Sequence, residues 1–100
     1  MTEIRVVTEG DNYRITAKGH SGYAPEGQDI VCAAISATML LTATIAICHG
    51  GELIGMEKGY TEILMPKNKE TQLIIDGLEI AMETMTIKHG KNISFFSEGV

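Results

Sequence analysis

A histidine and a cysteine, His20 and Cys32, stand twelve positions apart in the first third of the chain. A cysteine attacks a carbonyl carbon as the thiolate, and a free thiol is mostly protonated at neutral pH. A nearby imidazole can take that proton and later return one to a leaving amine. Backbone amides at a helix start beside the cysteine can hold the oxyanion that forms. The two residue types therefore predict nucleophilic attack by a thiol, with peptide or amide hydrolysis as the outcome.

The elements around the pair determine whether the two side chains can meet. Residues 21–28 contain several turn residues, which makes this segment a loop. They are Ser21, Gly22, Pro25 and Gly27. Asp29 then precedes an apolar, alanine-rich run with no breaker until Gly50, which is how a capped helix begins. Cys32 would be the third residue of that helix, near the unbonded amides and the positive dipole end that favour a thiolate.

Three of these residues admit more than one role. Asp29 either orients His20 as a third catalytic member or caps the helix, and capping is the commoner role at such a position. Ser36 lies one helical turn after Cys32 and either donates a hydrogen bond toward the site or bonds back to the Cys32 carbonyl. Cys32 has a structural alternative, because a lone cysteine among apolar residues is usually a small buried side chain.

The other polar candidates are weaker. Cys48 and His49 are neighbours whose side chains would point apart, and His49 and His89 both precede glycine, as residues at helix C-termini do. No CxxC, HExxH or carboxylate cluster has metal-ligand spacing, so we expect neither a metal nor another cofactor. On one helix Cys32 and Cys48 would lie roughly 24 Å apart, too far for a disulfide. We expect two free thiols in a reducing compartment.

Hydrophobic periodicity predicts the element order ββαββαβ in one domain. The fold class is α+β, with two helices packed on an antiparallel or mixed sheet. The predicted strands cover residues 3–9, 13–18, 52–57, 60–65 and 92–97, and the predicted helices begin at residue 30 and after residue 68. Residues 10–12 predict a three-residue hairpin turn. Strand alternation places His20 on the exposed side, unless a bulge at Gly19 reverses the face. The buried face of the second helix is predicted to contain Ile74, Leu78, Ala81 and Met85.

Composition restricts the partners. Eight basic and thirteen acidic side chains give a net charge of −5 with no basic stripe, so we expect no direct contact with nucleic acid. Residues 30–48 carry no charge and are long enough to span a membrane, but hydroxyl side chains dilute the run and amphipathic strands flank it. We expect a buried central helix, no membrane contact, and a homodimer that covers the remaining apolar surface. The N-terminus reads as a strand without the apolar core of a signal peptide, which favours the cytoplasm.

The segment from Gly19 to Ala37 resembles the signature of the ribosomal-processing cysteine protease family, called Prp. The matching residues are Gly19-His20, Gly22-Tyr23-Ala24, Gly27-Gln28-Asp29-Ile30-Val31-Cys32-Ala33-Ala34 and Ser36-Ala37. Chain length and element order extend the resemblance to one domain over residues 1–100. It implies a cytoplasmic bacterial endopeptidase, usually homodimeric, that removes a short N-terminal extension from large-subunit ribosomal protein twenty-seven.

The resemblance also implies roles for individual residues. It assigns catalysis to His20 and Cys32, and it matches the family's recurring aspartate and serine with Asp29 and Ser36. In that family the intervening loop is a mobile cover for the substrate. The corresponding residues here are Ser21, Gly22, Tyr23, Ala24, Pro25, Glu26, Gly27 and Gln28. The glycines in and beside this loop predict that the imidazole and the thiol reach hydrogen-bond distance only when a peptide binds.

Two alternatives stay open from the sequence. A phage-type relative would process a capsid or scaffold protein, and a catalytically silent module would bind a peptide or associate with the ribosome. Each of these hypotheses takes a protein or peptide as its partner.

Overall fold

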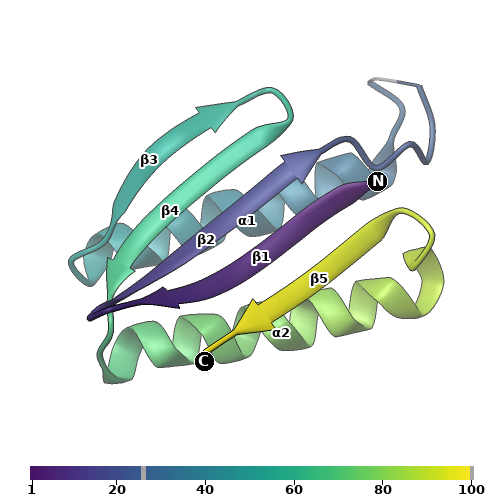
Figure 1. Cartoon of the computed structure of the whole chain (residues 1–100). Coiled ribbons are helices and arrows are strands. Elements are labelled where there is room, and N and C mark those ends of the chain that lie inside the picture. The colour runs from purple at the N-terminus through teal and green to yellow at the C-terminus, as the bar shows by residue number, and fades with distance from the viewer. Residues whose placement is uncertain (26, 100) are drawn as a thin grey trace.

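The protein is a five-stranded sheet with both helices on one of its faces, as the computed structural model shows (Figure 1). The structure describes residues 1–25 and 27–99. The elements are β1 (Thr2–Glu9), β2 (Asn12–Gly19), α1 (Ile30–Cys48), β3 (Glu52–Glu57), β4 (Tyr60–Pro66), α2 (Lys69–His89) and β5 (Ile93–Glu98). The predicted α+β class and the order ββαββαβ are confirmed.

The sheet is mixed, with the strand order β3-β4-β2-β1-β5. Strand β1 pairs antiparallel with β2 and parallel with β5, while β4 pairs antiparallel with both β2 and β3. This order brings three segments that are distant in sequence to one end of the molecule. They are the end of β2, the turn between β3 and β4, and the turn between α2 and β5.

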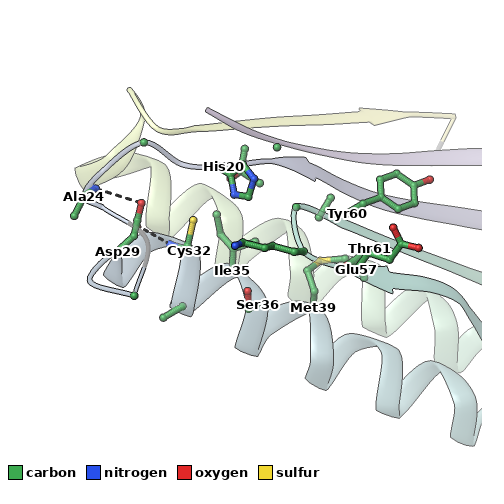
Figure 2. A pocket seen from close by; sticks show the side chains of 18 residues that line it. His20, Ala24, Asp29, Cys32, Ile35, Ser36, Met39, Glu57, Tyr60 and Thr61 are labelled. Atoms are coloured by element: carbon green, nitrogen blue, oxygen red, sulfur yellow. Dashed lines mark hydrogen bonds between the residues drawn. The ribbon is translucent and has the colours of Figure 1, made fainter.

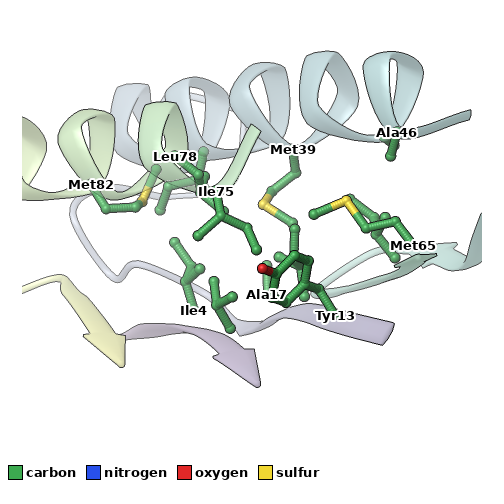
Figure 3. Close-up of a cluster of buried hydrophobic side chains, with 14 of the residues drawn as sticks. Ile4, Tyr13, Ala17, Met39, Ala46, Met65, Ile75, Leu78 and Met82 are labelled. Atoms are coloured by element: carbon green, nitrogen blue, oxygen red, sulfur yellow. The ribbon is translucent and has the colours of Figure 1, made fainter. Parts of the chain in front are cut away.

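The core lies between the sheet and the two helices (Figure 3). Alternate residues of each strand point inward, and one stripe of each helix packs on them. The buried hydrophobic residues are Ile4, Val6, Tyr13, Ile15, Ala17, Val31, Ile35, Met39, Ala43, Ala46, Ile63, Met65, Ile75, Leu78, Met82 and Ile93. Val31 and Ile35, near the start of α1, pack in this core with Ala17 of β2. This packing places Cys32 next to the end of β2.

Two details of the prediction were wrong. The first turn has two residues, because Asn12 already pairs with Glu9 in the β1–β2 ladder. The buried face of α2 is also rotated from the predicted one. Its fully buried residues are Thr71, Ile75, Leu78 and Met82, whereas the predicted Ile74, Ala81 and Met85 are half-buried at its margin. Long apolar side chains occupy both sides of this stripe, so apolar spacing alone could not locate its centre.

Helix α1 is unusually apolar for a surface helix. It has the length and composition of a membrane span, with a mean hydropathy of 2.2 in its most apolar window, of which 33% is buried. One stripe of the helix packs on the sheet, whereas Leu40, Leu41, Ile45 and Ile47 are exposed. The helix is thus both a core element and the source of an exposed apolar face.

Candidate active site

His20 stands at the end of β2, against the turn between β3 and β4. Gly19, the residue before it, has a φ of +97°, and a Cβ there would lie 2.6 Å from the Met1 carbonyl oxygen, so only glycine fits. The Gly19 N–H donates to the Gly59 carbonyl at 2.9 Å. The imidazole of His20 is exposed and lies so close over Gly59 that a Cβ on that glycine would be 3.0 Å from Nε2. The β3–β4 turn thereby defines where the imidazole rests.

Cys32 lies in the first turn of α1, as the sequence predicts. Asp29 is the N-cap, and its Oδ1 accepts the Cys32 N–H at 2.9 Å. The Asp29 carbonyl accepts the N–H of Ala33 at 3.1 Å. Cys32 is half-buried, and both Cys32 and Cys48 are free thiols. The sulfur that would act as nucleophile is therefore at the positive end of the helix dipole.

Asp29 also holds the base of the preceding loop. Its Oδ2 accepts the hydroxyl of Ser21 and the N–H of Tyr23 at 3.0 Å. It also accepts the N–H of Ala24 at 3.3 Å (Figure 2). Burial by itself raises the pKa of this carboxyl, but the hydrogen bonds from Ser21, Cys32, Ala24 and Tyr23 together hold it well below its usual range. None of the hydrogen bonds described for the carboxylate goes to His20, so in this structure Asp29 acts as a cap and loop anchor.

The depressed pKa of Asp29 predicts a specific acid sensitivity. A carboxyl with a lower pKa in the folded chain stabilises the fold above the pKa of the unfolded aspartate, about 3.9, and this contribution is lost as the pH falls further. We expect the Tm of the wild type to fall more steeply between pH 5 and pH 3 than that of Asp29→Asn, which should start several degrees lower. Thermal melts at both pH values measure this. Asp11→Asn in the exposed β1–β2 turn is the control, and equal slopes for wild type and Asp29→Asn would contradict the prediction.

The rest of the loop is tied to the α2–β5 end of the molecule. Asn92 Nδ2 donates to the Ser21 carbonyl at 2.9 Å. The Tyr23 ring meets the His89 ring edge-on, with centroids 5.2 Å apart. The Gln28 N–H donates to the Pro25 carbonyl at 2.9 Å. The predicted substrate loop therefore has defined contacts at both ends. Glu26, also part of the predicted loop, lies outside the described residues.

A cavity of about 580 Å³ joins the two candidate catalytic residues. It is bounded by the loop, the first half of α1 and the β3–β4 turn. Figure 2 shows the imidazole of His20 and the thiol of Cys32 facing its interior from opposite sides. A second cavity of about 310 Å³ adjoins it along α1 and shares Ser36, Glu57 and Thr61 with the first. The two cavities together form a groove along α1, and Cys32 lines its larger part.

Ser36 is exposed and lines both cavities, one turn along α1 from Cys32. Neither of its two predicted hydrogen bonds, to the site or back to the Cys32 carbonyl, is among those described. The sulfur of Cys32 has two described hydrogen bonds, both with Ser21. His20, Cys32, Asp29 and Ser36 thus all line the first cavity. No hydrogen bond is described between the imidazole of His20 and the thiol of Cys32.

Tyr60, the first residue of β4, lines the cavity next to the β3–β4 turn. Its hydroxyl donates to Glu62 at 2.6 Å, and Glu62 also pairs with Arg14. The hydrogen bond to Glu62 raises the pKa of Tyr60, burial and the carboxylate charge add to the rise, and the charge of Arg14 opposes it. Tyr60 therefore stays protonated at neutral pH.

Several residues of the site were not found from the sequence. Gly59 reaches His20, and Tyr60 reaches the cavity, through the pairing of β4 with β2, in which Lys18 faces Tyr60. Asn92 reaches Ser21 across 71 positions of sequence. Among the described residues no group of three or more His, Cys, Asp or Glu side chains could hold a metal ion.

The model of the family described as cysteine protease Prp matches residues 1–94 of the chain. The chain belongs to this family. The ribosomal processing cysteine protease Prp of Bacillus subtilis (strain 168) is 29% identical to it over 85 residues, which cover 75% of this chain and 76% of the relative. The protein is accordingly a cysteine protease of the Prp family.

Solved structures of Prp share the fold. The essential ribosomal processing protease Prp from S. aureus, in complex with a covalently linked product peptide, gives a TM-score of 0.82 at 21% identity and covers 97% of this chain and 99% of its own. The same protease in complex with a substrate peptide gives 0.77 at 20% identity with the same coverage. The Prp fold is therefore common to these chains despite their low identity.

Proposed function

We propose that this Prp-family protein is an endopeptidase in which Cys32 is the nucleophile and His20 the general base. The observation that carries the proposal is the cavity into which both side chains project, with the sulfur in the first turn of α1. Family membership favours this enzyme over a module that only binds peptides. Nothing in the site favours a capsid or scaffold protein as the substrate.

The proposed reaction uses these groups in sequence. His20 takes the thiol proton of Cys32, and the sulfur then bonds to the scissile carbonyl carbon. The positive end of the α1 dipole stabilises the oxyanion that forms. The carbon–nitrogen bond breaks as His20 returns the proton to the amine. Water, deprotonated by His20, finally hydrolyses the thioester and releases Cys32.

We propose that the substrate is the N-terminal extension of large-subunit ribosomal protein twenty-seven. The name of the B. subtilis relative supports ribosomal processing, and the substrate peptide bound to S. aureus Prp supports a peptide ligand. The walls of the groove along α1 include apolar side chains. These are Ile35, Met39, Leu40 and Met56.

Incubation with ribosomal protein twenty-seven carrying its extension tests this substrate. We expect one cut that shortens the N-terminus, seen as a single mass loss by intact mass spectrometry. The matched control is the same ribosomal protein without the extension, which should stay uncut. An extended protein that remains intact, or that is cut within its mature part, would remove this substrate.

We also propose that the protein is a homodimer that uses the exposed apolar face of α1. Leu41 at the middle of this face is 61% exposed, and Ile45, one helical turn further along, is also exposed. Apolar area of this kind is typical of interaction surfaces. We expect Leu41→Lys to shift the protein from dimer to monomer in sedimentation velocity at micromolar concentration.

The control for this interface is Leu73→Lys on α2, because Leu73 is 67% exposed and of the same residue type. It should leave the dimer intact. A wild type that sediments as a monomer would disprove the proposal. We further propose that the protein works in the cytoplasm, which its two free thiols support. Cell fractionation that finds it elsewhere would contradict this.

A further inference from the structure

Ser21 is the loop residue in direct contact with the candidate nucleophile. It is only 2% exposed. Its N–H donates to Cys32 Sγ at 3.4 Å, and its carbonyl is held by Asn92 Nδ2 at 2.9 Å. The backbone of Ser21 is thereby fixed from two sides, with the amide aimed at the sulfur.

The hydroxyl of Ser21 lies between Asp29 and the thiol. It donates its only proton to Asp29 Oδ2, and Cys32 Sγ donates to the same hydroxyl oxygen at 3.5 Å. The pKa of Asp29 is held well below its usual range, so this carboxylate is ionised and can only accept. The Ser21 oxygen is therefore restricted to offering a lone pair to the sulfur. A lone pair stabilises the S–H form and opposes a thiolate.

We infer that Ser21 is a positioning residue that holds the Cys32 thiol protonated, with its hydrogen directed at Ser21 instead of His20, until a peptide enters. The inference rests on the proposed role of Cys32 as nucleophile. In the active step the S–H bond turns from the Ser21 oxygen to the imidazole, and the proton passes from sulfur to nitrogen. The Ser21 N–H stays on the sulfur and stabilises the thiolate that remains.

The test is the pH dependence of Cys32 alkylation by iodoacetamide, followed peptide by peptide in a mass spectrometer. Removing the acceptor in Ser21→Ala should move the half-maximal rate of Cys32 labelling to lower pH by about half a unit, since a hydrogen bond is worth about 0.5–1.5 kcal/mol and one pH unit corresponds to about 1.4 kcal/mol. Cys48, exposed at the other end of α1, is the internal control and should keep its profile.

Other ionisable groups are shared by the wild type and Ser21→Ala, so their effects cancel in the comparison. Among the described residues, those that line the cavity with Cys32 or pack on the loop are His20, Asp29, Glu57, Lys58, Tyr60, Tyr23 and His89. A loop that was merely loosened would raise the plateau rate without moving the midpoint. An unmoved midpoint, or a shift to higher pH, would overturn the inference.

Ser21→Thr retains the hydroxyl and should keep the wild-type midpoint. These rates are read without any peptide cleavage, so their failure is distinguishable from failure of the proposed nucleophile.

Discussion

Cys32→Ala should reduce cleavage of the extended ribosomal protein below detection, and His20→Ala should lower kcat about 10²–10⁴-fold. The alanine at position 32 has no atom that can form the thioester. Without the imidazole at position 20, the thiol must lose its proton to water and the leaving amine must gain one from water. Initial cleavage rates at saturating substrate, followed by mass spectrometry, measure both effects.

The chain carries its own matched controls at the far end of α1, where Cys48 and His49 are neighbours. Cys48→Ala and His49→Ala remove the same residue types from exposed positions and should leave the cleavage rate within about twofold, as surface substitutions away from a site do. Because nucleophile and base act as one unit, the double variant Cys32→Ala/His20→Ala should be no slower than Cys32→Ala. Cleavage that survives Cys32→Ala would remove that thiol from the reaction.

The sequence was sufficient for the parts of this site that depend on local structure. Asp29 ahead of an uncharged, alanine-rich run predicted the N-cap, and the structure has this carboxylate on the Cys32 N–H. His20 is exposed, as strand alternation predicted, but its imidazole faces the cavity beside α1, on the side of the sheet that the helices cover. Gly19, with a φ of +97°, interrupts the alternation directly before His20. The cap follows from residues within one helical turn, so spacing is enough to locate it, whereas the direction of the imidazole is not set by strand parity.

The contacts that complete the site depend on the sheet order, which spacing alone does not determine. Gly59 meets His20 because β4 pairs with β2, and Asn92 meets Ser21 because β5 joins the edge of β1. Ser21 also looked like an ordinary polar loop residue, yet it is buried under these contacts. The long-range pairing thus converts a flexible-looking segment into a support for the thiol.

Gly59→Ala should lower kcat/KM about 100-fold, because an added methyl displaces the imidazole of His20 from its resting place and misplacement by about 1 Å can cost that much. The new Cβ would lie 3.0 Å from Nε2 and 3.1 Å from Cε1. The His20 side chain is exposed and can swing aside, so the fold should survive with the ring in the wrong position. The residue also has a φ of +76°, and an alanine there costs about 1–2 kcal/mol of stability.

Gly10→Ala separates these two effects. Gly10, in the β1–β2 turn, has a φ of +59° and no heavy atom within 4 Å of the position that a Cβ would occupy. Both variants should therefore lose a similar amount of stability in thermal melts, while only Gly59→Ala loses activity. Steady-state kinetics on the extended ribosomal protein, at a temperature where both variants are folded, supply the comparison. If the two variants cleave at equal rates, the β3–β4 turn has no part in placing His20, and the position of the imidazole must come from Gly19 and the β2 ladder alone.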